Sequence, residues 1–491
     1  GFLITSLPEI FYDSLVYHLG IPKTYLIEHS LGFLKYNFFQ TLTGICEHIF
    51  IWLLALGESQ LCRMFNLLLG AVIVLAAFKV LKKIFSDFAA VSFCLLMASV
   101  PMYFITITST GSETLAMFFM CASFISMIES EKASKYKDMS FLLFGLAAAT
   151  KYTAFFGAPL LFIWAISKKD ENQSYLTLFI RYGLIFSLPL LPHFIRNLSF
   201  TGNPFYPYLY GIFGFIKPDP DLFMAWKNDL LANTRWGVFG FFGVVWDASL
   251  RGVARHDFLG PIFIAFAPFL LFLKNEKKHL LILYFAIGLY VFEFQFTNIL
   301  RMFLPFQIVF ILPFALTFDE FIYKRLLKVF LIICVFFNLC WQGILCISSF
   351  GGFVVRDLGD EILYLSIPHE TLYPPSCYPA YEFLRNNPKY KKVLIIGDAR
   401  NFYCPIKSLT NTVFNKPPLI ELFEKYEAKE VLGLLKKEGF DTLLINRSEL
   451  GRTYSYKYDK EKYFDDIRAL LGLDFNLIFE YESLLLYEFP K

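Results

Sequence analysis

The sequence predicts an α-helical protein that crosses a membrane several times and carries a small α/β domain after its helices. An excess of apolar residues, a series of long apolar runs and a change of composition near residue 350 predict this. Of 491 residues, 56% are hydrophobic and only 18% are charged. Soluble proteins hold fewer apolar residues, whereas lipid-facing side chains must be apolar as well. We therefore assign residues 1–350 to a transmembrane domain and residues 351–491 to an extracytoplasmic α/β domain.

About nine or ten crossings are expected, because a crossing helix needs roughly 20 apolar residues. The run 42–57 contains Glu47 and His48, so we expect it to be re-entrant or to lie along the interface. Residues 140–166 contain Lys151, and we expect two shorter helices that meet there. The apolar start at Gly1 is interpreted as the tail of a truncated first helix. The clear candidates for crossing are 61–80, 88–107, 111–128, 174–198, 259–273, 280–296, 301–317 and 326–349.

Five basic loops predict the orientation, because lysine and arginine collect on the cytoplasmic side of a membrane. All five face one side if 42–57 does not cross and 140–166 enters and returns. Residues 1–41, 199–257 and those after 350 are then outside an inner (plasma) membrane. The loops contain Lys79, Lys82 and Lys83; Lys132, Lys135 and Lys137; Lys168 and Lys169; Lys274, Lys277 and Lys278; and Lys324, Arg325 and Lys328.

We expect short strands and helices to alternate after residue 356. We expect Cys377 and Cys404 to be free thiols, although an oxidising location would allow them to pair. Ile396–Arg400 contains a single glycine, so it is interpreted as a strand-to-loop junction and not as a nucleotide site. The expected elements are strands at 392–397 and 441–446, helices at 418–437 and 460–472, and a hairpin of 477–481 with 483–489 that turns at Glu482.

Composition and motifs exclude several functions. A net charge of +3 without a basic cluster argues against nucleic-acid binding. The sequence has no CxxC pair, no GxGxxG or Walker loop and no HExxH. We therefore expect no cofactor, and we leave a requirement for a divalent metal open.

The first external segment carries the strongest candidate for chemistry. Asp13, Tyr17 and His18 fall within about one and a half helical turns, and the first two share a face. A carboxylate near low-dielectric walls can act as a general base. The alternative is that Asp13 caps the helix that follows it.

Other polar residues interrupt apolar runs and so need a partner or a function. Glu113 either faces a cavity or stabilises a helix N-terminus. Lys151, followed by Tyr152, requires an anion, which would be a phosphate or a structural carboxylate. Arg196, followed by Asn197, and Arg301 lie at external helix ends, where they either reach lipid headgroups or hold a phosphate.

Several of these pieces, in this order, resemble bacterial GT-C membrane glycosyltransferases, the relatives of protein mannosyltransferases and aminoarabinose transferases. The resemblance covers roughly residues 5–350. The tail at 396–403 is similar to the α/β domain that follows some of these enzymes. The matching pieces are 12–26, 37–57 with Glu47, 98–101, Glu113, 145–153, Arg196–Asn197 with 201–207, and 301–305.

The resemblance implies a hexosyl- or pentosyltransferase that moves a sugar from a polyprenyl-phosphate donor to a glycan, lipid or protein acceptor, with inversion. It implies that Asp13 is the base and that Lys151, Arg196 and Arg301 hold the donor phosphate. Tyr17, His18, Glu47, Glu113, Tyr152 and Asn197 would surround the same cavity. Two alternatives stay open, namely a transporter or flippase of lipid-linked glycans and a scaffold without activity.

Overall fold

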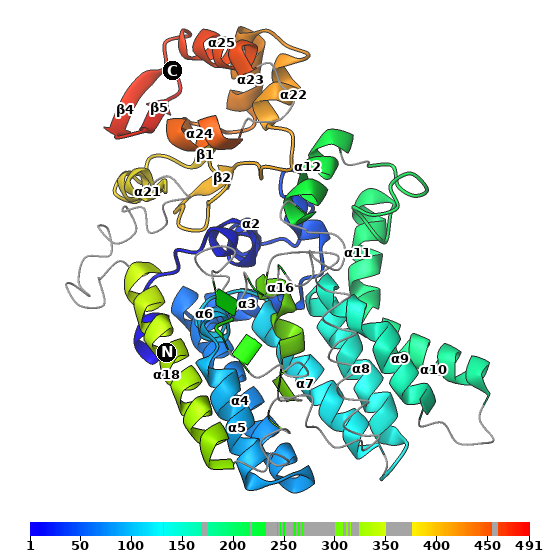
Figure 1. Cartoon of the computed structure of the whole chain (residues 1–491). Coiled ribbons are helices and arrows are strands. Elements are labelled where there is room, and N and C mark those ends of the chain that lie inside the picture. The colour runs from blue at the N-terminus through cyan, green and yellow to red at the C-terminus, as the bar shows by residue number, and fades with distance from the viewer. Residues whose placement is uncertain are drawn as a thin grey trace.

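The structure is a computed structural model (Figure 1). It describes residues 1–130, 132–167, 174–216, 219–231, 243, 246, 249–250, 259–261, 264–265, 268, 300–307, 311–312, 315, 324–349, 376–453 and 460–491. Most of the predicted crossing at 259–273, all of the one at 280–296 and part of the one at 301–317 lie outside these ranges. The same holds for the basic loops at 168–169 and 274–278.

The first segment is short and irregular, and a buried arginine holds it against the helices. Arg63, only 1% exposed, donates from Nη1 to the carbonyl of Pro8 at 3.2 Å and from Nε to the carbonyl of Thr108 at 2.8 Å. Because a guanidinium offers five donors, one side chain joins three parts of the chain. The elements of the segment are α1 (Phe2–Thr5), the π-helix η1 (Ser14–His18), α2 (Gly20–Glu28) and the 3₁₀-helix η2 (Phe38–Thr41).

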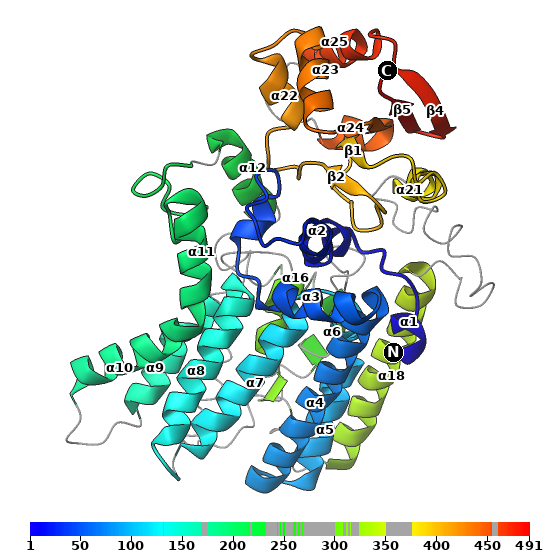
Figure 2. The same cartoon turned by 180° about the vertical axis from the view of Figure 1, so that it is seen from behind.

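The helical part follows as a layer of long helices beneath this segment (Figures 1 and 2). Its elements are α3 (Ile45–Leu56), α4 (Ser59–Ile84), α5 (Asp87–Ser99), α6 (Pro101–Ile107), α7 (Glu113–Glu129), α8 (Lys135–Thr150), η3 (Tyr152–Gly157), α9 (Ala158–Ser167), α10 (Tyr175–Ser187), η4 (Leu188–Leu190), α11 (Leu191–Thr201), α12 (Pro220–Leu231), α16 (Leu300–Phe303), η7 (Leu304–Phe306) and α18 (Lys324–Ser349).

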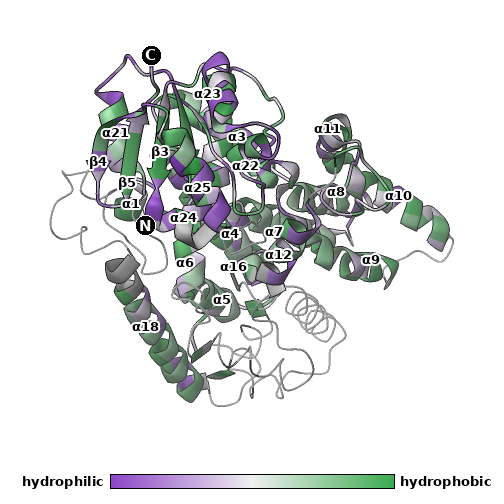
Figure 3. Ribbon diagram, turned by 90° about the horizontal axis from the view of Figure 1, so that it is seen from above, coloured by the Kyte–Doolittle hydropathy of each residue, from purple (hydrophilic) through white to green (hydrophobic). Residues whose placement is uncertain are grey.

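In the described ranges, three helices are long and apolar enough to cross a membrane, namely Ser59–Ile84, Tyr175–Thr201 and Arg325–Ile344. The bent pair α5–α6, with a 71° angle, makes a fourth if it counts as one span. Large side chains such as Leu68, at 66% exposed, and Phe336, at 67%, point outward, as lipid contact requires. Figure 3 shows the apolar character of α18.

Two irregular stretches have the form that the sequence predicts. The 12-residue α3 is too short to span a bilayer, and it lies across the upper ends of the long helices (Figures 1 and 2). Residues 135–167 form α8, a break at Lys151, and then η3 and α9. The break places the backbone of Lys151 between two helices and turns its side chain toward a cavity.

The C-terminal part is a five-stranded sheet with the order β2-β1-β3-β5-β4. Strands β2, β1 and β3 run parallel, and β5 and β4 join antiparallel as the predicted hairpin. Glu482 turns this hairpin with a φ of 51°. The strands are β1 (Lys392–Ile396), β2 (Lys407–Leu409), β3 (Thr442–Asn446), β4 (Asn476–Tyr481) and β5 (Leu484–Glu488), and the helices are α21 (Tyr378–Arg385), α22 (Pro418–Phe423), α23 (Ala428–Lys437), α24 (Arg447–Thr453) and α25 (Lys460–Leu471).

The two faces of the sheet are buried differently. Helices α22, α23 and α25 contribute to one apolar cluster with Leu443 and Ile445 of β3, and α21 packs on the other face around Tyr381. Cys377 and Cys404 are buried there as free thiols. The predicted helix at 418–437 is divided into α22 and α23, and the sequence analysis did not predict β2, α21 or α24.

The sheet sits over the first segment, to which the loops on either side of β2 attach it (Figure 1). Tyr403 Oη donates to the Glu9 carbonyl at 2.9 Å, and the backbone N–H of Phe38 donates to Asn415 Oδ1 at 2.7 Å. Lys35 and Glu421 form an ion pair at 2.5 Å. The C-terminal part therefore contacts the segment that carries Asp13.

Candidate functional site

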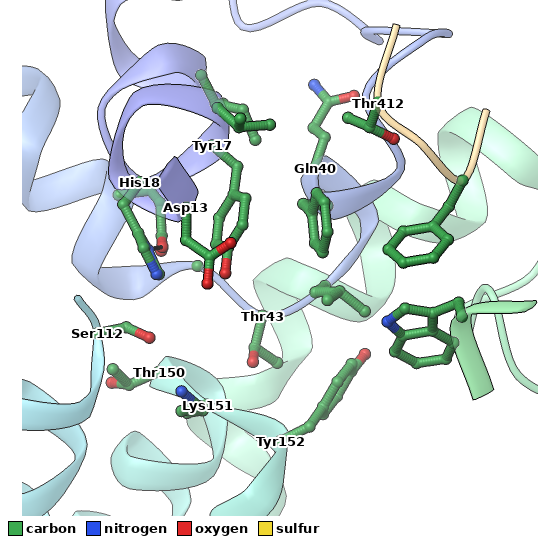
Figure 4. A pocket seen from close by; sticks show the side chains of 18 of the residues that line it. Asp13, Tyr17, His18, Gln40, Thr43, Ser112, Thr150, Lys151, Tyr152 and Thr412 are labelled. Carbon is green, nitrogen blue, oxygen red and sulfur yellow. Dashed lines mark hydrogen bonds and ion pairs between the residues drawn. The ribbon is translucent and has the colours of Figure 1, made fainter. Parts of the chain in front are cut away.

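A cavity of about 360 Å³ lies between the first segment, the upper ends of the helices and the C-terminal sheet. Figure 4 shows it from close by. It brings together side chains that are almost 400 residues apart in the sequence. Of the predicted site residues, those that line it are Asp13, Tyr17, His18, Glu47, Lys151, Tyr152, Arg196 and Arg301. Glu113 and Asn197 are not among the lining residues, and each supports the wall from behind.

Asp13 occupies the position before η1 but does not cap it. Its side chain accepts no capping hydrogen bond from the helix backbone. Instead, the carboxylate is ion-paired with the guanidinium of Arg301, which also stacks over the Phe11 ring at 4.9 Å. The capping alternative is therefore wrong, and the carboxylate faces the cavity (Figure 4).

Tyr17 lies beside Asp13 on the cavity wall, as their spacing predicts. Burial, and the negative charge of Asp13, raise the pKa of the Tyr17 hydroxyl well above its usual value. Its ring stacks on Phe39 with centroids 4.2 Å apart. The hydroxyl is therefore a neutral hydrogen-bonding group and not a base.

His18 and Glu47 form a dyad on the same side. His18 Nδ1 lies 2.5 Å from Glu47 Oε1, and both side chains are buried, at 6% and 12% exposed. Since the ring is fixed by this contact, its tautomer and orientation are set by α3. His48 also lines the cavity, and its Nδ1 lies 2.6 Å from the carbonyl of Gly44.

Lys151 has a structural carboxylate as its partner. Its Nζ lies 2.5 Å from Oε1 of Glu113, the first residue of α7. Glu113 begins α7, where the helix dipole favours an anion, and it is the carboxylate partner of the cavity lysine, but it does not itself line the cavity. The pair leaves the Lys151 side chain on the cavity wall.

Arg196 is held by backbone carbonyls and by His193. Its Nη2 donates to the carbonyls of Gln40 at 2.6 Å and Leu42 at 3.0 Å, and to His193 Nδ1 at 3.0 Å. A guanidinium only donates, so Nδ1 is the acceptor and Nε2 carries the proton toward Tyr152 Oη, 2.5 Å away. Arg196 therefore braces this wall as well as lining it.

The carboxylates of the site do not form a metal-binding cluster within the described ranges, where no group of three or more His, Cys, Asp or Glu side chains converges. Glu9, the other acid of the first segment, accepts from the N–H groups of Ile10, Phe11 and Thr110 and from the Thr110 hydroxyl. Both carboxylate oxygens of Glu9 therefore accept hydrogen bonds that hold the first segment in place. The described residues of this cavity therefore supply no metal site, and we assign no step to a metal.

Sequence patterns do not mark the residues that the C-terminal part and the segment 202–231 bring to the cavity. Ala399 and Thr412–Phe414 come from the loops beside β2, and Tyr208 and Trp226 come from the segment 202–231. No local pattern marks them, because their position depends on contacts between distant segments. Thr412 lies across the cavity from Asp13 in Figure 4.

A buried charge network in the loop after β1 contacts the same segment. Arg400 binds Asp398 with Nε at 2.9 Å and Nη2 at 2.7 Å, and it reaches Glu449 at 3.2 Å. Its guanidinium lies 5.4 Å from the centre of the Tyr12 ring. Gly397 permits this turn with a φ of 91°, because a Cβ there would lie 2.7 Å from the Asn446 carbonyl. The loop thus reaches the residue next to Asp13.

Comparisons with known proteins show what this arrangement is similar to. A family model described as dolichyl-phosphate-mannose-protein mannosyltransferase matches residues 44–195. No curated protein matches the chain. The sequence similarity to a family therefore covers the helices from α3 to α11.

Solved structures match over nearly the whole chain. ArnT from Cupriavidus metallidurans, bound to undecaprenyl phosphate, has a TM-score of 0.60 at 13% identity, over 99% of this chain and 95% of its own. An oligosaccharyltransferase from Archaeoglobus fulgidus, tethered to an acceptor peptide, has a TM-score of 0.53 at 12% identity, over 99% and 71%. A mutant arabinofuranosyltransferase AftD from Mycobacteria has 0.54 at 11%, over 100% and 41%. These structural matches, at such low identities, show a shared fold.

Proposed function

We propose that this chain, which has the GT-C fold of membrane glycosyltransferases predicted from its sequence, transfers a sugar from a polyprenyl-phosphate donor to an acceptor outside the membrane. Asp13 is the general base, and the configuration at the transferred carbon inverts. Lys151, Arg196 and Arg301 are the donor-phosphate ligands. The sugar is a hexose or pentose, and the acceptor is a glycan, a lipid or a protein.

One observation carries this proposal: a single cavity presents the Asp13 carboxylate together with three cationic side chains. A lipid phosphate needs cations, and acceptor activation needs a base within reach. The ArnT structure, which has the same fold, contains undecaprenyl phosphate. The cavity therefore offers the groups that both substrates require.

The Asp13–Arg301 ion pair suggests how the donor prepares the base. A donor phosphate that binds Arg301 competes with Asp13 for the guanidinium. The released carboxylate then accepts the proton of the acceptor hydroxyl. The acceptor oxygen forms a bond to the anomeric carbon, the bond from that carbon to the phosphate oxygen breaks, and polyprenyl phosphate leaves. Lys151 and Arg196 stabilise the charge that develops on the leaving phosphate.

The test is Asp13→Asn in the full chain. General-base catalysis contributes about 10²–10⁴-fold, so sugar transfer from labelled polyprenyl-phosphate sugars should fall by that factor while the protein stays folded and inserted. Asp138→Asn is the matched control, because Asp138 also pairs with an arginine, Arg181, but lies outside the cavity. Wild-type transfer rates in Asp13→Asn would remove this carboxylate from the mechanism.

The transporter alternative predicts broken helices in corresponding halves of the chain. The bent pair α5–α6 is the broken span found in the described ranges. Its bend of 71° follows Val100 and precedes Pro101, which begins α6. A proline at the first helical position accounts for a new helix start. The same labelled donors separate the alternatives, since a flippase would move them without transferring sugar.

A further inference from the structure

Five aromatic residues form part of the cavity lining. We call this surface the aromatic wall; it consists of Tyr17, Phe39, Tyr208, Trp226 and Phe414, all of which line the cavity. Tyr17 stacks on Phe39 at 4.2 Å, Phe39 meets Phe414 at 5.9 Å, and Tyr208 meets Trp226 at 5.8 Å. The rings come from four separate parts of the chain.

The buried ring of Phe38 lies behind the wall and contacts two of its members, which connects them. Its ring lies 5.1 Å from Trp226 and 5.9 Å from Phe414, and it is 4% exposed. The backbone beneath is fixed too, because the Thr412 N–H donates to the Tyr36 carbonyl at 3.1 Å. The wall is therefore held in place before a ligand binds, and such preorganisation lowers the free-energy cost of binding.

The charged groups meet the aromatic wall at Tyr17, which lies beside Asp13 (Figure 4). Asp13, His18 and Lys151 are together on one side of Figure 4, with Thr412 on the opposite side. Residues 412–414 all line the cavity, so Phe414 belongs to the side on which Thr412 lies. The cavity thus has an ionic part suited to a phosphate and an aromatic part suited to an uncharged ring.

The position of the wall limits what it binds. Phe414 belongs to the C-terminal part and Trp226 to α12, and both parts lie above the long helices (Figure 1). In the proposed function, the polyprenyl tail of the donor lies in the bilayer around the long helices, below this level. A sugar ring presents a face of polarised C–H groups, which the negative face of an aromatic ring attracts.

We propose that the aromatic wall is an acceptor subsite that binds the face of a pyranose ring, with Phe414 as a specificity-determining residue. The acceptor is thus a glycan or a glycolipid. This inference rests on the proposed function and deepens it, because the C-terminal part then supplies a piece of the substrate site. The wall holds the acceptor sugar, while the ionic part holds the donor phosphate.

The first test is binding of small pyranosides to the full chain in nanodiscs free of sugar-based detergent. The probes are the methyl pyranosides of glucose, mannose, galactose and N-acetylglucosamine, with mannitol as an acyclic control. In saturation-transfer NMR, ring C–H protons of at least one pyranoside should receive saturation, and mannitol should receive none. Absence of transfer to all four pyranosides would overturn the proposal.

Variants at the wall give the second test. Phe414→Leu keeps an apolar side chain but removes the ring, so pyranoside affinity should fall about 2- to 10-fold, as loss of one aromatic contact predicts. Phe414→Tyr should restore it. The matched control is Tyr426→Leu, since Tyr426 is 42% exposed in the same part of the chain and lies outside the cavity. Unchanged affinity in Phe414→Leu would contradict the proposal.

A third measurement tests whether the aromatic wall binds the acceptor or the lipid donor. Undecaprenyl phosphate affinity, and the KM for whichever labelled donor the wild type uses, should be the same in Phe414→Leu as in the wild type. A change in either would assign the wall to the donor and overturn the acceptor subsite. If the wild type binds a pyranoside but neither binds undecaprenyl phosphate nor transfers sugar, the proposed function fails while the subsite stands.

Discussion

Several buried charges in the described part of the chain are paired, and the pair Glu113–Lys151 shows the consequence at the residue scale. Their charged atoms lie 2.5 Å apart at the ends of α7 and α8. Removing one partner of a buried pair leaves the other uncompensated, at a cost of about 3–5 kcal/mol, whereas removing both costs much less. The pair therefore joins two helices and also places a cation in the cavity.

We predict that Glu113→Gln lowers the free energy of unfolding by about 3 kcal/mol and that adding Lys151→Met recovers much of the loss. Unfolding of the full chain in detergent measures both. Undecaprenyl phosphate affinity should be lower in the double variant than in the wild type, because Lys151, a proposed phosphate ligand, is gone. A Glu113→Gln variant as stable as the wild type would show that the pair is not structural.

The Asp398–Arg400 pair predicts a pH dependence. Burial alone would raise the pKa of Asp398, but the Arg400 guanidinium and hydrogen bonds from Arg400 and Asn446 hold it below its usual range. The unfolded carboxyl titrates near pH 4, so folding stabilises the ionised form. This stabilisation is complete well above pH 4 and is lost as the pH falls through the lower folded value.

Amide hydrogen exchange of β1 and β3 in the full chain measures this effect. Protection should decrease as the pH falls below about 4, after correction for the intrinsic exchange rates. Asp398→Asn should reduce protection at neutral pH and flatten the acid dependence. An unchanged acid dependence in Asp398→Asn would place its origin in another group.

At the scale of elements, the loops on either side of β2 connect the sheet to the first segment. The Tyr403 hydroxyl donates to the Glu9 carbonyl, four residues before Asp13. One hydrogen bond contributes about 1 kcal/mol, which corresponds to roughly a fivefold rate. These loops are therefore connected through the backbone to the position of Asp13.

We predict that Tyr403→Phe lowers kcat about fivefold and leaves the donor KM unchanged, since the phosphate ligands are untouched. Tyr481→Phe is the control, because Tyr481 is 42% exposed on β4. Initial rates at varied donor concentration separate the two constants. Equal changes in kcat and donor KM would indicate a general loss of structure and not a positioning role.

Elements that depend on local sequence were predicted well. The strands at Lys392–Ile396 and Thr442–Asn446, the hairpin turn at Glu482 and the break at Lys151 follow from apolar runs and the polar residues that interrupt them. Strand β2 was not predicted, because it has three residues and no apolar alternation. It is a strand because β1 offers it a parallel partner.

The orientation is a prediction for the whole molecule. Lys83, at the end of α4, should face the cytoplasm, and Lys425, in the C-terminal part, should face outward. Lys83→Cys and Lys425→Cys, each in the full chain, test this with a membrane-impermeant maleimide on intact cells. Only Lys425→Cys should react before permeabilisation, relative to the unsubstituted chain. Labelling of both from the same side would contradict the proposed topology.

At the scale of the whole molecule, the sequence does not predict which charged side chains pair with one another. It predicted that Asp13, Lys151, Arg196 and Arg301 share a site, and they line one cavity. It did not identify the partner of each charge, because Asp13 and Arg301 are 288 positions apart. Nor did it predict Phe414 on the wall, since that placement depends on how the sheet sits on the first segment.

The attachment of the sheet through the loops on either side of β2 also affects how such proteins can be recombined. Tyr403, Asn415 and their partners Glu9 and Phe38 form a matched set. Chimaeras that exchange C-terminal domains between homologues should therefore keep residues 397–415 with the native residues 8–40. The β4–β5 tip makes no such contacts in the described part of the chain, so it is a suitable place to graft an epitope or a fiducial for imaging.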